Sequence, residues 1–192
     1  MEIKKENVLA AYETARKAGA DSTMKVLESL FGEETFKPKD VTERIKTFED
    51  ACQELGEEHP FVVAYRAVED IDECSGDIEA YLKLRIIVAA LNEGWTPELK
   101  EDEILYYPWH WLYTQDEIDN MDEDERKERR MMQTGDYATG YAGFAYADSL
   151  SAPSGANAVI GSRLCLKSSE LASYCGKQFI GIWADFRLIR RQ

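Results

Sequence analysis

The sequence predicts an α+β fold, in which an N-terminal antiparallel helical bundle precedes a small antiparallel sheet packed on a C-terminal helix. Up to about residue 95, apolar residues recur at the three-and-four spacing of amphipathic helices. From residue 135 the composition changes to Gly, Ala, Ser and Tyr, which is typical of short strands and turns. Between these parts lies the aromatic stretch, residues 106–113, where five of eight residues are aromatic.

These changes in composition suggest a division of the chain. We expect a helical domain over residues 1–95, then the aromatic stretch with a charged helical linker over 96–134. Strands and a C-terminal helix would occupy 135–192, as one cooperative unit with the aromatic stretch or separately. A chain of 192 residues fits one domain or two small ones.

Charge is distributed unevenly along the chain. The net charge is −14, and residues 1–130 hold 17 Lys and Arg against 33 Asp and Glu. The last 62 residues hold 6 basic and 4 acidic side chains. This balance disfavours direct nucleic-acid binding, which needs a basic face. It favours a solvated acidic surface, and the contrast between the halves makes a homo-oligomer conceivable.

Cysteine usage and hydropathy indicate a cytoplasmic protein. The four cysteines form no CxxC pair and no zinc-finger spacing, and Cys52 and Cys175 fall on apolar faces of predicted helices. We therefore expect free thiols. No signal-peptide pattern and no apolar run of membrane-spanning length is present, so no membrane contact is expected.

Helix signals follow one another through the first half. Predicted helices run over 5–18, over 21–31 with Asp21 as cap, over 40–55 with Asp40 and Glu43 as a capping box, from Pro60, and over 76–94. The segment 84–91 is apolar nearly all round, which predicts a buried central helix.

The aromatic stretch has the alternation of a strand, and Pro108 rules out a regular helix there. Thr114 and Glu117 predict a capping box that starts a charged, solvated helix reaching Arg130. Its charges would pair at spacing four, as Asp122–Arg126 and Glu125–Arg129.

The C-terminal part predicts a glycine-rich hairpin and a helix. Tyr137, Tyr141, Phe144 and Tyr146 suit strands, residues 151–155 a turn, and 159–166 a second strand. Apolar residues then recur at helical spacing over 169–187, which predicts one amphipathic helix on the sheet face.

No motif indicates catalysis, a metal or a cofactor. His59 precedes Pro60, as a helix cap or surface residue would. His110, among tryptophans, is more typical of a packed histidine than of a general base. The acidic residues 116–125 lack the ligand spacing of a calcium loop, and the glycines match no phosphate-binding pattern. We therefore expect a non-enzymatic protein without cofactors.

The aromatic residues are the candidate binding surface, because Trp and Tyr dominate protein interfaces and also stack on sugars. Core packing is the favoured interpretation of the aromatic stretch, ahead of a partner interface and a ligand platform. For residues 136–160, a plain glycine-rich hairpin is an equal alternative to a binding surface. The candidate site residues are Tyr107, Trp109, His110, Trp111, Tyr113, Tyr137, Tyr141 and Tyr146.

Four stretches of the chain resemble a family of uncharacterised proteins from phages and prophages of gut Bacteroidetes bacteria. They are PKDVTERIKTFEDACQELGEEHP at 38–60, AYLKLRIIVAALNEGW at 80–95, YYPWHWLYTQDEIDNMDEDER at 106–126 and GSRLCLKSSELASYCGKQFIGIWADF at 161–186. The resemblance implies a phage or mobile-element setting, hence a place in the cytoplasm of the bacterial host cell or on a virion, and it carries over no catalytic residue. Residues 141–167 are also similar to the closing strands of C-type-lectin-like domains, although Ser162 replaces the usual aromatic residue and a helix follows.

Three functions follow as hypotheses, of which the least favoured is a hydrolase that uses His110 with a carboxylate such as Asp116 or Asp136. The first is a binding or structural module of a phage or mobile element that contacts a partner protein or a glycan through its aromatic residues. The alternative is an acidic DNA mimic that inhibits a nucleic-acid-binding enzyme of the host.

Overall fold

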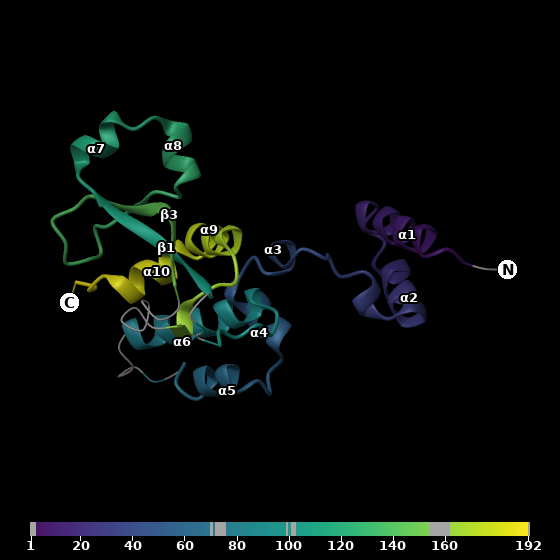
Figure 1. Ribbon diagram of the computed structural model, residues 1–192. Coiled ribbons are helices and arrows are strands. Elements are labelled where there is room, and N and C mark those ends of the chain that lie inside the picture. The colour runs from purple at the N-terminus through teal and green to yellow at the C-terminus, as the bar shows by residue number, and fades with distance from the viewer. Residues whose placement is uncertain are drawn as a thin grey trace. The chain divides into compact units, whose positions relative to one another are not determined.

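The computed structural model describes residues 3–69, 71, 76–98, 100, 103–153 and 162–191 and shows an α+β fold (Figure 1). The chain forms two compact units, residues 1–44 and residues 45–192. The aromatic stretch and the charged segment after it therefore lie inside the second unit, together with α4 to α6 of the expected helical domain. We call the second unit the larger unit.

The smaller unit contains two paired helices, α1 (Lys5–Lys17) and α2 (Asp21–Phe31), then the 3₁₀ turn η1 (Glu33–Thr35) and α3 (Val41–Arg44). Both long helices match the predicted ranges. Asp21 is the first residue of α2 and not its cap. Ala20 takes the cap position and makes no side-chain hydrogen bond there.

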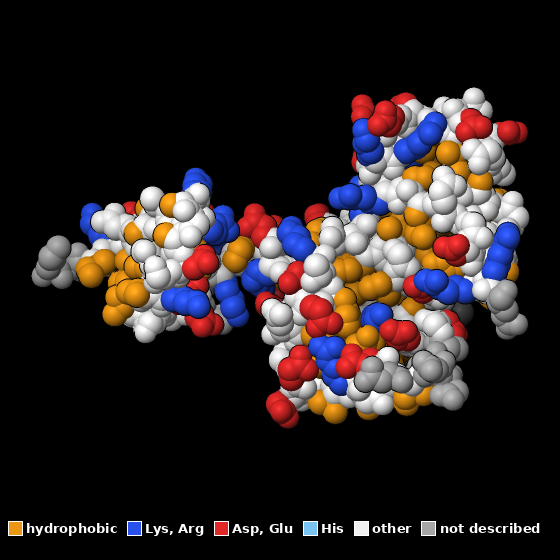
Figure 2. Space-filling view, turned by 180° about the vertical axis from the view of Figure 1, so that it is seen from behind, with side chains coloured by type: hydrophobic (Ala, Val, Ile, Leu, Met, Phe, Trp, Pro, Cys, Tyr) orange, Lys and Arg blue, Asp and Glu red, His pale blue; other side chains and the backbone are white. Residues whose placement is uncertain are grey.

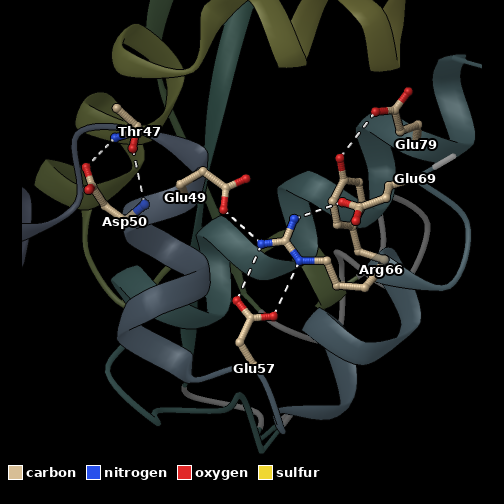
Figure 3. Close-up of polar contacts among 8 residues, drawn as sticks. Thr47, Glu49, Asp50, Glu57, Arg66, Glu69 and Glu79 are labelled. Carbon is tan, nitrogen blue, oxygen red and sulfur yellow. Dashed lines mark hydrogen bonds and ion pairs between the residues drawn. The ribbon is translucent and has the colours of Figure 1, made fainter.

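The helix predicted over 40–55 is divided into α3 and α4 (Phe48–Leu55). Thr47 has extended backbone and starts α4, because its hydroxyl accepts the Asp50 N–H (3.1 Å) while the Asp50 carboxylate accepts the Thr47 N–H (2.8 Å) (Figure 3). The carbonyls of Ile45 and Lys46, freed from a helix, are held by Tyr174 and Gln178 of the C-terminal region. The periodicity of this stretch hid the capping box of Thr47 and Asp50. At the predicted box, the Asp40 carboxylate accepts the Thr42 N–H (2.8 Å), and the Glu43 N–H donates to the Asp40 carbonyl.

Helices α5 (Pro60–Arg66) and α6 (Gly76–Leu91) follow as predicted, with Pro60 as the first residue of α5. The guanidinium of Arg66 ties α4 to α5 through Glu49 (2.8 Å), Glu57 (3.4 Å) and Glu69 (2.8 Å), as Figure 3 shows. Helix α6 contacts α4 and α5, and its segment 84–91 is buried as expected.

The sheet has three strands in the order β1-β3-β2, with β1 (Ile104–Tyr113), β2 (Met132–Gln133) and β3 (Gly143–Pro153) all antiparallel. The prediction of a hairpin between the strand around Phe144 and residues 159–166 is therefore wrong. Strand β3 pairs instead with the aromatic stretch and with β2. Residues 151–153, predicted as a turn, belong to β3. Residues 154–161 lie outside the described residues, and 162–164 form the 3₁₀ turn η3 (Ser162–Leu164) in place of a strand. Within the described residues 162–166, a single bridge, Leu166 to Tyr106, remains of the predicted second strand.

The charged segment forms two short helices, α7 (Gln115–Asn120) and α8 (Glu123–Glu128), rather than one. The predicted Thr114–Glu117 capping box is present. A second cap divides the segment, because Asp122 is extended and accepts the Glu125 N–H at 2.7 Å. The Glu125–Arg129 pair forms at 2.8 Å.

The C-terminal region also forms two helices, α9 (Ser169–Gln178) and α10 (Ile180–Arg187), with a break at Phe179. Helix α9 packs on β1 and β3, as expected for the sheet face, and α10 packs on α6. These two helices therefore form the middle layer of the larger unit, between the sheet and the helices α4 to α6 (Figure 1).

Candidate functional site

Three of the predicted site residues are exposed together at one end of the sheet. Trp109, Trp111 and Tyr141 have exposed fractions of 43%, 49% and 46%. They line one shallow pocket of about 490 Å³. Tyr113 is partly buried at the end of β1. We call Trp109, Trp111 and Tyr141 the aromatic surface.

Strand alternation sets Trp109 and Trp111 apart from their neighbours. Successive side chains of β1 point to opposite faces, so Pro108 and His110 are buried towards α9 and α10 while the two tryptophans face outward. Their rings lie 5.5 Å apart and are perpendicular. The two rings form an edge-to-face pair, and part of their apolar surface is exposed to water.

Tyr141 reaches the same pocket because the chain folds back after β2. The Ala142 N–H donates to the Tyr113 carbonyl (2.8 Å), and the Thr134 N–H donates to the Ala142 carbonyl (3.1 Å). The hydroxyl of Thr134, itself buried, holds the Tyr141 carbonyl. The loop that carries Tyr141 is thus tied to the end of β1.

Two polar residues that were absent from the predicted site complete the pocket. Thr114 and Glu117 line it, and the Glu117 carboxylate accepts the Thr114 N–H at 2.7 Å. Hydrogen bonds from the Thr114 backbone and hydroxyl lower the pKa of Glu117 below its usual value. The capping-box motif directly after the aromatic stretch was the signal that could have placed them there.

The outer edge of β1 is a further part of this site. Tyr106 exchanges both backbone hydrogen bonds with Leu166 on that edge, so the backbone groups of Pro108, His110 and Leu112 point to it as well. The guanidinium of Arg187 donates to the Pro108 carbonyl (2.9 Å). Within the part of the chain that the structure describes, no hydrogen bond reaches the edge groups of His110 and Leu112.

His110 is buried in the core between sheet and helices. Its Nε2 lies 3.0 Å from the carbonyl oxygen of Gly176, and its ring stacks on Phe144 with centroids 4.7 Å apart. Burial lowers the pKa of His110 to about 4, so the imidazole is neutral at pH 7. It holds α9 against the sheet.

The three remaining tyrosines also serve packing. Tyr107 packs with Leu105, Cys165 and Trp95, and burial raises its pKa to about 12. The hydroxyl of Tyr137 donates to Asp185 (2.7 Å), and that of Tyr146 pairs with Ser173 on α9. The structure therefore separates these buried residues from the aromatic surface.

The described residues contain neither a candidate metal site nor a membrane-spanning helix. No three His, Cys, Asp or Glu side chains in the described ranges lie close enough together to hold a metal ion. No helix in those ranges combines the length and the apolar character needed to cross a membrane. Cys52, Cys165 and Cys175 are free and buried, and Cys74 lies outside the described residues.

Comparison with known proteins adds no relative, since no family model, no curated protein and no solved structure matches this chain.

Proposed function

We propose that this chain is a non-enzymatic binding module that takes up an extended segment of a partner protein at the aromatic surface and along the outer edge of β1. The observation that carries the proposal is the grouping of Trp109, Trp111 and Tyr141, each almost half exposed, at one pocket. Large aromatic side chains left in water at a concave site are typical of interface residues that contribute most of the binding energy.

The edge of β1 supports a protein partner over a glycan. An extended peptide can add to an open sheet edge through its main chain, while pockets beside the edge select its side chains. Pro108 lacks an N–H and its carbonyl is held by Arg187, so pairing would begin at His110 and continue to Leu112. The perpendicular Trp109 and Trp111 rings form a notch for side chains, where a sugar would prefer one broad aromatic face.

A displayed library of random peptides tests the proposal directly. Selection on the full chain, with counter-selection on the Trp109→Ala/Trp111→Ala variant, should enrich peptides that bind the aromatic surface. The double variant should weaken their binding at least roughly thirtyfold, the effect of losing one strong interface residue. The variant Val63→Ala/Ile78→Ala is the matched control, because it removes two exposed apolar side chains of α5 and α6.

Backbone methylation of a selected peptide tests the strand pairing. Methyl groups on the alternate amides that face β1 should abolish binding, whereas methyl groups on the intervening amides should leave it intact. Equal effects of both patterns would contradict edge addition. Peptides that bind the double variant as well as the parent chain, or a glycan whose binding needs Trp109 and Trp111, would contradict the protein partner.

The salt dependence of partner binding distinguishes this proposal from the DNA-mimic alternative. Binding by apolar aromatic contacts should change little between about 50 and 500 mM salt, whereas an acidic decoy should lose its partner enzyme as salt screens its charge. On the face shown in Figure 2, acidic and basic side chains are interspersed around exposed apolar side chains. In the phage setting that the family resemblance implies, the partner would be a host or virion protein.

A further inference from the structure

A second cavity lies away from the aromatic surface, within the larger unit. Its volume is about 420 Å³, which falls in the range of small-molecule sites. One wall is formed by Arg85 and Val88 of α6 and by Asn92, the residue directly after the helix. The start of α5, the segment around Trp95 and the turn η3 provide the others.

Arg85 is the main charged group of this cavity. Its guanidinium carbon lies 3.9 Å from the centroid of the Phe61 ring, so the side chain is stacked and held in place. Its Nε is buried and donates to no group in the described part of the chain. A ligand in the cavity does not reach this buried N–H, but the two terminal NH2 groups of Arg85 are not buried in the same way and can donate to a ligand oxygen.

Two other side chains that line the cavity can also donate hydrogen bonds. The Nδ1 of His59 accepts the Phe61 N–H (3.2 Å), so in the neutral ring the proton sits on Nε2, which can donate. The exposed Arg163 adds a second guanidinium at the rim. No Asp or Glu is among the described residues that line the cavity, although the chain has 37 of them.

We propose that this cavity binds a small organic anion with a planar apolar body, such as an aromatic carboxylate. The carboxylate would accept hydrogen bonds from Arg85, with Arg163 and His59 beside it, because a guanidinium matches the two oxygens of a carboxylate. The apolar body would lie against Trp95, Val88 and Phe61. The site is independent of the aromatic surface, with which it shares no lining residue.

Titration calorimetry on the full chain with 2-naphthoate and its uncharged counterpart 2-naphthamide tests the assignment. The two probes share one ring body and differ in charge. We expect 2-naphthoate to bind with one site per chain and about tenfold or more tighter than the amide, the effect of a charge-assisted hydrogen bond. Arg85→Gln should remove this preference and leave the weak binding of the amide unchanged.

Two further variants keep the test decisive. Lys127→Gln removes one positive charge from the exposed face of α8, away from the cavity, and should bind 2-naphthoate as the parent chain does. Arg163→Gln, whose side chain is exposed, should weaken 2-naphthoate even if Arg85→Gln fails to fold. Equal affinity for the two probes, no 2-naphthoate binding at millimolar concentration, or binding indifferent to both arginine variants would overturn the proposal.

Discussion

The imidazole of His110 in β1 donates its Nε2 proton to the carbonyl of Gly176 in α9, across 3.0 Å. A carbonyl can only accept, which assigns the proton of the neutral ring to Nε2. Gly176 lies in the last turn of α9, where carbonyls lack partners within the helix. One histidine therefore satisfies the end of α9 and fixes its position on the sheet.

We expect this histidine to make the larger unit less stable in mild acid. The pKa of His110 is lowered by burial from 6.5 to about 4, so between these values the unfolded chain binds a proton that the folded chain excludes. Stability is then complete above pH 6.5 and falls as the pH drops towards 4. The free energy of unfolding should decrease by about 2 kcal/mol between pH 7 and pH 5 from this group alone.

Urea unfolding followed by tryptophan fluorescence measures this effect, because all four tryptophans lie in the larger unit. The control is His110→Gln, whose side-chain amide can still donate to Gly176 and does not titrate. His59 and the carboxylates are common to both proteins, so the difference between the two pH profiles reports His110. Parallel profiles would show that the imidazole is not protected from protonation.

Gly176→Ala should destabilise the larger unit by about 1–3 kcal/mol, the usual cost of overpacking. An added Cβ would lie 2.6 Å from Cβ of Pro108 and 2.7 Å from the Tyr146 ring, closer than packed atoms allow. The matched control is Gly181→Ala in α10, where a Cβ meets nothing within 4 Å and should stabilise the helix by up to about 1 kcal/mol. Chemical denaturation of both variants gives the comparison, and equal stabilities would contradict the close approach.

The helices of this fold could be predicted because their signals are local. Apolar periodicity located α1, α2, α5 and α6, and the all-apolar run marked the buried helix. The same periodicity ran through Thr47 and Phe179, and charge pairs at spacing four ran through Asp122, yet the chain breaks at all three residues. Two of these breaks come from side-chain caps, and the third lies one turn beyond the site where a histidine of a distant strand binds the helix end.

The sheet and most of the candidate site could not be predicted, because they depend on pairing between distant residues. The strand character of β1 was visible, but its partner begins 30 residues later, at Gly143. That pairing and the packing of α9 decide which aromatics are buried. Trp109 and Trp111 were candidates together with His110, yet the face of β1 that α9 covers takes only His110 into the core.

Thr47→Ala should cost about 1 kcal/mol, because it removes the side-chain acceptor for the Asp50 N–H at the start of α4. Thr47→Ser keeps the hydroxyl and should stay within a few tenths of a kcal/mol of the parent. Urea denaturation distinguishes them. A serine variant as unstable as the alanine variant would assign the loss to the methyl group and not to the cap.

Asn92→Ala should be among the more damaging single changes, at about 2–3 kcal/mol or more. The buried Asn92 amide donates to the Cys165 carbonyl (2.9 Å) and accepts the Lys167 N–H (3.0 Å), so it joins the end of α6 to the segment that bridges to β1. Alanine would leave the Cys165 carbonyl and the Lys167 N–H without their side-chain partner. Hydrogen exchange adds a local readout, because the Leu166 N–H donates to Tyr106 (2.9 Å) and should lose protection.

The control for this change is Asn120→Ala on α7, whose amide donates to the Asp116 carbonyl in an exposed position. Water can replace that hydrogen bond, so the cost should be at most about 0.5 kcal/mol. Comparing the two variants separates the effect of losing any asparagine side chain from the effect of losing the buried hydrogen bonds of Asn92. Similar stabilities of the two variants, with Leu166 still protected, would mean that the 165–167 segment is held to α6 by its apolar contacts and not by Asn92.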